Sequence, residues 1–257
     1  IMGRNLSQGE LLEHKELALK KIEAYIDSLI QHPDGKVRSK ADKLSYWLED
    51  WSTFLSFESE FSPSSLRRYK RGEIIKAHLG YNVGSEEGGL HYCVIVDKNN
   101  SIYSPVITII PLTSVKPWTN VEKLKKGCVY LGNELFTNLS SKISLVHKTI
   151  TAQIGDLQQR IDNIGITDED EKETLIASIE MDIQKAQSEQ TLLFGMMDEV
   201  RKMKRGSIAL TNQITTISKI RIYDPKTNYD ILSNVKLSNE KLDLIDNEIL
   251  QNFTGAK

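Results

Sequence analysis

The amino-acid sequence predicts an α+β protein, and two observations lead to this fold class. Between residues 70 and 114, short runs of β-branched residues alternate with Gly, Asn, Ser and Pro, a pattern that is typical of strands. Before and after this segment, apolar residues recur at spacings of three and four, which indicates amphipathic helices. We therefore expect an antiparallel strand unit that is accompanied by helices.

Residues 1–62 are expected to form an N-terminal pair of helices. Two apolar stripes at helical spacing support this expectation: Leu19, Ile22, Ile26 and Leu29 in the first helix, and Val37, Ala41, Leu44, Leu48, Trp51 and Leu55 in the second. Between the stripes, the sequence His32-Pro33-Asp34-Gly35 predicts the turn that joins the two helices.

Residues 63–132 are expected to contain the first part of the strand unit. The β-branched runs predict a meander of three strands, at Ile74-Ile75, Val94-Ile95-Val96 and residues 106–110. The connection between the first two strands is rich in glycine, which tolerates positive φ angles, so its backbone N–H groups can approach an anion or a nucleotide. A plain hairpin loop explains the same composition.

A long helical hairpin is expected at residues 133–204. No proline occurs between Leu131 and Gly206. Two apolar stripes cover this stretch: Leu139, Ile143, Val146, Ile150, Ile154, Leu157, Ile161 and Ile164, and then Ile176, Ile179, Ile183, Ala186, Leu193, Met197 and Val200. Gly165 favours a helix end, and Thr167 with Asp170 favours a new helix start. The pattern predicts an antiparallel coiled-coil hairpin, which either packs on itself or receives a partner.

Residues 205–257 are expected to complete the strand unit and to end in a helix. Residues 206–211 are strand-like, and Ser238 precedes a helical stripe formed by Leu242, Ile245, Ile249 and Phe253. The helical hairpin is therefore expected as an insertion into the strand unit, not as a linker between two domains.

Several motifs together resemble the MazF/PemK family of toxins. The first set is Arg71-Gly72-Glu73-Ile74, Val83-Gly84-Ser85-Glu86, Gly88-Gly89, Val94-Ile95-Val96, Tyr103-Ser104-Pro105 and Pro111-Leu112-Thr113-Ser114. The second set is Gly206-Ser207-Ile208-Ala209-Leu210, Gln213-Ile214 and Thr216-Ile217-Ser218. The resemblance covers residues 70–131 and 205–253, and the helical hairpin takes the place of a short loop that these toxins have between adjacent strands.

The resemblance implies a small SH3-like antiparallel β-barrel that cleaves single-stranded RNA without a metal ion or another cofactor. It also implies a homodimer and a cognate antitoxin that lays a disordered segment across the RNA groove. In this family, a catalytic arginine follows the Gly-Gly pair, and a catalytic threonine ends the third strand. Thr113 matches the threonine, whereas His91 stands at the arginine position. Asn212 and Thr215 likewise stand where some relatives have an acidic residue and a second arginine.

His91 and Thr113 are the predicted catalytic residues. Metal-independent RNA cleavage uses the ribose 2′-OH as nucleophile, so the protein must help to remove its proton and to stabilise the charge on the phosphate. An imidazole exchanges protons near neutral pH, but in its neutral form it stabilises a phosphate less well than an arginine does. The hydroxyl of Thr113 can hydrogen-bond to a phosphate or a 2′-OH. In the alternative interpretation, His91 only bonds to backbone at the start of a strand.

Further RNA contacts are expected from Ser85, Glu86, Gly88, Gly89, Ser104, Ser114, Lys116, Asn212 and Gln213. Two basic clusters either extend this face or form a solvated rim: Arg67, Arg68, Lys70 and Arg71, and then Lys116, Lys123, Lys125 and Lys126. No His, Asp, Glu or Cys residues have metal-ligand spacing, so no metal site is expected.

Composition limits the function classes. A chain of 257 residues with 39% hydrophobic and 26% charged residues is typical of a protein with one or two folded domains. The formal net charge of -2 argues against a generic nucleic-acid binder. No apolar run approaches the ~20 residues that span a bilayer, and no signal-peptide pattern is present, so we expect a cytoplasmic protein without membrane contact.

Two functions therefore remain open at the level of sequence. The first is an endoribonuclease toxin of a toxin–antitoxin system, which the glycine-rich loop and Thr113 favour. The second is a non-catalytic barrel that binds RNA or proteins through its helical arms, which His91, Asn212 and Thr215 favour, because they replace the residues that act in relatives. We favour the ribonuclease.

Overall fold

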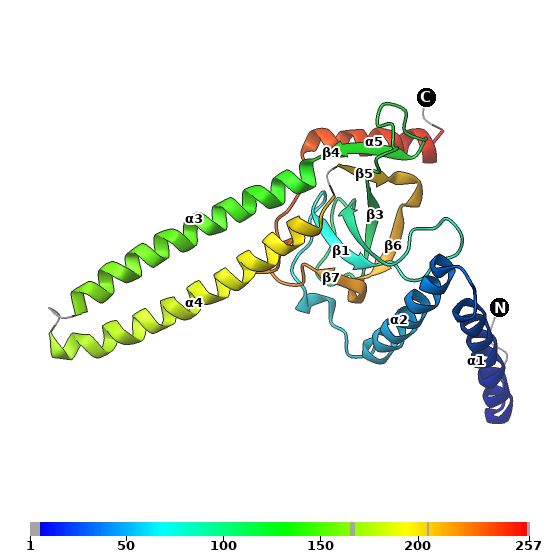
Figure 1. Cartoon of the computed structure of the whole chain (residues 1–257), viewed down its shortest axis with the longest axis horizontal. Coiled ribbons are helices and arrows are strands. Elements are labelled where there is room, and N and C mark those ends of the chain that lie inside the picture. Colours follow the sequence, from blue (N-terminus) through cyan, green and yellow to red (C-terminus); the bar gives the residue numbers. More distant parts are fainter. Residues whose placement is uncertain (1–5, 165–167, 205, 256–257) are drawn as a thin grey trace. The chain divides into compact units, whose positions relative to one another are not determined.

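The computed structural model describes residues 6–164, 168–204 and 206–255 (Figure 1). This part of the chain divides into two compact units. One unit contains the first two helices and the loop Leu79–Gly89, and the other contains Ser62–His78 and the residues from Leu90 onward. The expected helix-end residues Gly165 and Thr167 lie outside the described residues, as does the side chain of Asp170.

The first unit contains the predicted N-terminal pair of helices. Helix α1 spans Gln8–Ile30 and helix α2 spans Gly35–Phe57, and the two pack against each other. A capping box begins α1: the Ser7 hydroxyl accepts from the Glu10 N–H at 3.3 Å, and the Glu10 carboxylate accepts from the Ser7 N–H at 2.8 Å. This reciprocal pair satisfies backbone groups that the first turn of a helix leaves without a partner.

The glycine-rich loop Leu79–Gly89 closes on itself. The Leu79 N–H donates to the Gly89 carbonyl at 2.8 Å, and the Gly89 N–H donates to the Gly80 carbonyl at 2.7 Å. At Gly88, a Cβ atom would lie 2.6 Å from the Gly80 oxygen, and Gly89 has a φ angle of 85°. Glycine is therefore required at these two positions by a close backbone approach and by a left-handed conformation.

The second unit is built on one antiparallel sheet of seven strands among the described residues. The strands are β1 (Ile74–His78), β2 (Leu90–Ile95), β3 (Val106–Ser114), β4 (Cys128–Gly132), β5 (Ser207–Leu210), β6 (Thr215–Ser218) and β7 (Ile222–Asp224). Their hydrogen-bonded order is β4-β5-β3-β2-β1-β7, and β6 pairs with β3 beside this path. The predicted meander of β1, β2 and β3 is confirmed, and so is the mixture of helices and antiparallel strands.

Strand β3 is paired on both of its edges. On one edge, Ile110 lies opposite Val94 of β2. On the other edge, the first half of β3 pairs with β6, and the second half pairs with β5, where Thr113 lies opposite Ile208. The end of β3 is therefore enclosed by β5, and this enclosure positions the pocket described below.

Two long helices are inserted between β4 and β5. Helix α3 spans Glu134–Asn163, helix α4 spans Glu169–Lys202, and the two run antiparallel side by side (Figure 1). Because β4 and β5 are hydrogen-bonded to each other, the two helices connect adjacent strands of the sheet. The helices pack through buried apolar residues that include Ile150, Leu157, Ile179 and Leu193.

The roots of α3 and α4 join the core of the second unit. Leu135, Leu139 and Met196 are buried in one apolar cluster with residues of the sheet and of the C-terminal helix α5 (Asn239–Phe253). Ser238 caps α5, as predicted, by accepting from the Lys241 N–H at 3.3 Å. Short 3-10 helices, η1 (Pro63–Ser65), η3 (Thr211–Gln213) and η4 (Lys219–Arg221), connect other elements. In the described residues, no helix has both the length and the apolar character needed to cross a bilayer.

Lys142 fastens α3 to the segment between β7 and α5. Its ammonium group donates to the backbone oxygens of Asp230, Ile231 and Ser233 at 3.1, 2.8 and 2.9 Å. Burial lowers the pKa of Lys142 to about 8, against the opposing influence of nearby carboxylates such as Asp224. The side chain is therefore a tertiary clamp that stabilises this segment with a partly buried charge.

We predict that Lys142→Met lowers the free energy of unfolding by about 2 kcal/mol at pH 7, because three backbone oxygens lose a charged donor. The difference from wild type should also depend on pH. The pKa of Lys142 is about 8 in the folded protein and has an ordinary value of 10.5, so between these values the unfolded state binds more protons. The stability of the wild type should rise with pH in this window relative to the variant.

Urea unfolding from pH 7 to pH 10.5 measures both effects, with Lys148→Met, an exposed lysine of the same helix, as the control. Equal stability of the two variants, or parallel pH profiles of wild type and Lys142→Met, would contradict the prediction.

Candidate functional site

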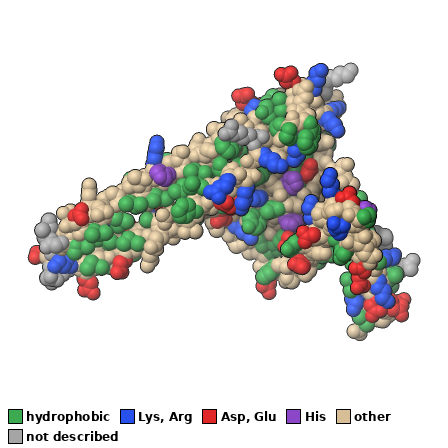
Figure 2. Space-filling view, in the orientation of Figure 1, with side chains coloured by type: hydrophobic (Ala, Val, Ile, Leu, Met, Phe, Trp, Pro, Cys, Tyr) green, Lys and Arg blue, Asp and Glu red, His purple; other side chains and the backbone are tan. Residues whose placement is uncertain are grey.

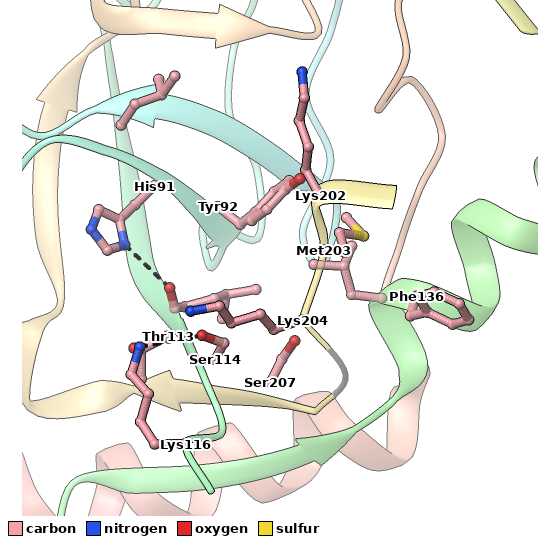
Figure 3. Close-up of a pocket in the computed structure, with 13 residues that line it drawn as sticks. His91, Tyr92, Thr113, Ser114, Lys116, Phe136, Lys202, Met203, Lys204 and Ser207 are labelled. Carbon is pink, nitrogen blue, oxygen red and sulfur yellow. Dashed lines mark hydrogen bonds between the residues drawn. The ribbon is translucent and has the colours of Figure 1, made fainter. Parts of the chain in front are cut away.

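A pocket of about 260 Å³ opens in the second unit where β2, β3 and β5 meet the roots of α3 and α4 (Figure 3). It is lined by Leu90, His91, Tyr92, Leu112, Thr113, Ser114, Lys116, Leu135, Phe136, Lys202, Met203, Lys204 and Ser207. None of these described residues is acidic, whereas three are lysines. The pocket therefore has the charge expected for binding an anion.

His91 lies on β2, opposite Ala77 of β1, and is half-buried. Its Nδ1 atom is 3.3 Å from the carbonyl oxygen of Leu112 on β3 (Figure 3). A carbonyl oxygen only accepts hydrogen bonds, so Nδ1 holds the proton and donates it, and Nε2 has the lone pair of the neutral ring. The pairing of β2 with β3 thus sets the tautomer of a histidine at the pocket.

Thr113 and Ser114 bring hydroxyl groups to the same pocket as His91. Both residues end β3, where Ser114 lies opposite Ser207 of β5. Lys116 follows this strand, and its Nζ atom is 3.5 Å from the Ser114 hydroxyl. The pocket therefore combines a histidine, several hydroxyls and an ammonium group, which together can bind an anion and transfer a proton.

The structure adds pocket residues that the sequence analysis missed. Phe136 comes from the first turn of α3, Lys202 ends α4, and Lys204 follows that helix. A signal was present in the sequence, because basic residues cluster directly before Gly206. The pairing of β4 with β5 returns both ends of the insertion to the sheet, so these residues are distant from His91 in sequence and near it in space.

Glu199 ties the end of α4 to the sheet beside the pocket. Its carboxylate accepts from the Lys76 ammonium at 2.7 Å and from the Tyr92 hydroxyl. Burial acts to raise the pKa of Glu199, but the hydrogen bonds from Lys76 and Tyr92 outweigh it, and the pKa lies below its ordinary value. Burial, together with the bond to Glu199, raises the pKa of Tyr92 far above its ordinary range. Tyr92 therefore positions its neighbours and does not titrate near neutral pH.

Several predicted RNA contacts do not line this pocket. They are Ser104 before β3, and Asn212 and Gln213 in η3. The predicted contacts Ser85, Glu86, Gly88 and Gly89 belong to the loop of the first unit. The position of η3 has a simple cause: β5 is antiparallel to β3, so the chain after β5 moves away from the end of β3 that lines the pocket. Of the predicted RNA contacts, Ser114 and Lys116 do line it.

The basic cluster before β1 is engaged in structural contacts. Arg67 forms a buried ion pair with Glu73 at 2.9 Å, in which both side chains are 4% exposed. Arg71 pairs with Asp246 of α5. These two cations are therefore neutralised within the fold, and neither forms the solvated rim that the sequence allowed. Among the described residues, no group of His, Cys, Asp and Glu side chains could hold a metal ion.

The second unit is thus an α+β structure whose pocket combines a histidine, hydroxyls and lysines. Residues 70–173 match the family model of PemK-like, MazF-like toxins of type II toxin–antitoxin systems. The resemblance stated from the sequence is therefore supported for residues 70–173. No curated protein matches the chain.

The segment that matches the family model contains part of the pocket lining and leaves the rest outside. It includes His91, Thr113 and Lys116, together with helix α3. It excludes Lys202 and Lys204 from the far end of α4, and it also excludes residues 205–253, where the sequence motifs suggested a second stretch of resemblance.

We predict that Glu199→Gln lowers the free energy of unfolding by about 2 kcal/mol at pH 7, because Lys76 loses its charged partner and Tyr92 its charged acceptor. The pKa of Glu199 lies below the ordinary value of 4.5, so this contribution is complete above that pH and is lost as the pH falls through the lower folded value. Thermal unfolding from pH 7 to pH 3 should therefore show the two proteins converging in acid.

The matched control is Glu180→Gln, an exposed glutamate of the same helix, which should behave as the wild type does. A difference between wild type and Glu199→Gln that stays constant down to pH 3 would rule out the assigned role of the carboxylate.

Proposed function

We propose that this protein is the toxin of a type II toxin–antitoxin system and a metal-independent endoribonuclease that cleaves single-stranded RNA. The observation that supports this proposal most is that His91 and Thr113 line one pocket with lysines and further hydroxyls. A phosphodiester is an anion that such groups bind well. Both residues also lie in the segment that matches the toxin family.

In the proposed reaction, the ribose 2′-oxygen bonds to phosphorus while the bond from phosphorus to the 5′-oxygen breaks. Nε2 of His91 accepts the proton of the 2′-OH, since Nδ1 is committed to the Leu112 carbonyl. The Thr113 hydroxyl donates to a phosphate oxygen. Water gives a proton to the departing 5′-oxygen and regains one from the protonated His91, so the ring returns to its neutral form. The products are a 2′,3′-cyclic phosphate and a 5′-hydroxyl.

The family resemblance supports finer proposals. We propose that the sheet forms an SH3-like barrel, that α3 and α4 form a coiled coil, and that the protein is a cytoplasmic homodimer with a cognate antitoxin. We also propose RNA contacts by the predicted residues outside the pocket. The corresponding division of the chain is 1–62 for the N-terminal helices, 63–132 for the first part of the barrel, 133–204 for the insertion, and 205–257 for the barrel completion and the C-terminal helix.

The surface of the inserted helices favours a second candidate function. Ile154, Ile161, Ile176 and Ile183 are 53%, 46%, 43% and 37% exposed. Figure 2 shows hydrophobic side chains in rows along both helices. Apolar side chains repeated along an exposed helical surface are typical of interaction sites. A non-catalytic regulatory module that binds RNA or a protein through its helical arms would use this surface.

We predict that the purified protein cleaves a long single-stranded RNA in the presence of EDTA and leaves 2′,3′-cyclic phosphate ends. His91→Ala should slow single-turnover cleavage by at least about 100-fold through loss of the proton acceptor. Thr113→Ala should slow it by about 10-fold to 100-fold through loss of a donor to the phosphate. Gel analysis of the products and chemical identification of their ends measure these effects.

His147→Ala and Thr151→Ala, two exposed positions on α3, are the matched controls and should cleave at the wild-type rate. Cleavage that persists in His91→Ala would refute the assigned role of the histidine. A wild-type protein that does not cleave RNA would refute the ribonuclease proposal and favour the binding module.

A further inference from the structure

The proposed reaction needs more positive charge than His91 supplies. Negative charge grows on the phosphate oxygens as the 2′-oxygen attacks, and a fixed cation stabilises this charge. An imidazole that accepts a proton starts as a neutral ring, so it does not supply that cation in the ground state. The described lining of the pocket offers ammonium groups on Lys116, Lys202 and Lys204.

Lys202 is engaged on the surface of α4. Its Nζ atom is 2.5 Å from the Asp198 carboxylate one turn earlier, and its side chain is 69% exposed. Figure 3 shows the Lys202 ammonium group directed away from Thr113. This lysine therefore does not supply charge at the centre of the pocket.

Lys204 has the opposite orientation. Figure 3 shows its side chain reaching across the pocket, with the ammonium group toward His91 and Thr113. Within the described parts of the chain, no ion pair involves Lys204. Lys116 approaches from the other side, where its Nζ atom lies 3.5 Å from the Ser114 hydroxyl. An anion bound beside Thr113 would thus lie between two ammonium groups.

The chain is anchored on the helix side of Lys204. The N–H of Met203 donates to the carbonyls of Glu199 and Val200 at 3.1 Å, and Met203 packs against the apolar core. Glu199 is itself bound to Lys76 of β1 at 2.7 Å. The end of α4 is therefore held against the sheet just before Lys204.

The chain is also anchored on the strand side. The carbonyl of Gly206 accepts from the Val115 N–H at 3.0 Å, and Ser207 lies opposite Ser114. Gly206 has a φ angle of 81°, and a Cβ atom there would lie 2.8 Å from the Val115 side chain, so this close approach requires glycine. The chain is therefore anchored directly before Lys204 and again two residues after it.

We propose that Lys204 supplies the fixed positive charge that stabilises the scissile phosphate, so that the helical insertion forms part of the active site. This inference rests on the proposed ribonuclease function. Lys204 follows α4 at the end of the insertion, and it lies outside the residues 70–173 that match the family model.

Single-turnover cleavage of a single-stranded RNA in EDTA tests this inference with Lys204→Met, Lys204→Gln and Lys204→Arg. The two neutral variants should slow cleavage by about 100-fold, and the arginine variant, which keeps the charge, should stay within about 10-fold of wild type. Binding of a fully 2′-O-methylated RNA, which lacks the nucleophile, should weaken by less than about 10-fold, because the charge acts mainly in the transition state. The slope of log affinity against log salt should decrease by about 0.7.

Lys185→Met, an exposed lysine of α4 away from the pocket, is the control and should match the wild type. Circular dichroism and Tm establish that each variant is folded; Lys204→Gln decides the outcome if Lys204→Met is not. Cleavage by the neutral Lys204 variants at the Lys185→Met rate would overturn the inference and leave the ribonuclease proposal intact. A wild-type protein that does not cleave RNA would overturn the ribonuclease proposal and this inference with it.

Discussion

The double pairing of β3 is the constraint on which the rest of the second unit depends. One edge of the strand holds β2 in the register that sets His91 against the Leu112 carbonyl. The other edge holds β5 in the register that sets Ser207 against Ser114. Both walls of the pocket are thus aligned by a single strand. Side chains alternate between the faces of a sheet, so a slip of one residue in β3 would turn Thr113 away from the pocket.

The helical insertion is attached to this sheet by two different kinds of interaction. Leu135, Leu139 and Met196 bury apolar surface in the core, an interaction without directional preference. The carboxylate of Glu199, by contrast, bonds to Lys76 and Tyr92 in a defined geometry. Apolar packing holds the root of the insertion on the sheet, and the polar contacts fix its orientation, so the end of α4 meets the pocket in one arrangement.

The sequence predicted the features that depend on local pattern. Helical spacing predicted α3 and α4, β-branched runs predicted β1 to β3, and motifs next to those strands drew attention to His91 and Thr113. The features that the sequence did not predict depend on pairing between segments that are far apart in the chain. Lys204 reaches the pocket only because β5 returns to β3 beside Ser114.

Long-range pairing also determines the surroundings of residues that stand out in the sequence. Arg67 belongs to a basic run that suggests a surface, yet its partner Glu73 buries it. Asn212 follows a strand of the pocket, but the antiparallel direction of β5 places it outside the pocket lining. In both cases, a local pattern drew attention to the residue, but the tertiary fold determined which residues surround it.

The position of the insertion has a consequence for how this protein can vary. Because β4 and β5 are hydrogen-bonded to each other, the two ends of the insertion leave the sheet as immediate neighbours. In the described part of the insertion, the pocket is lined by the first turn of α3, the last turn of α4 and the residues that follow α4. The outer turns of both helices are therefore uncoupled from the geometry of the pocket, and evolution can lengthen, shorten or resurface them without a change at the strand ends.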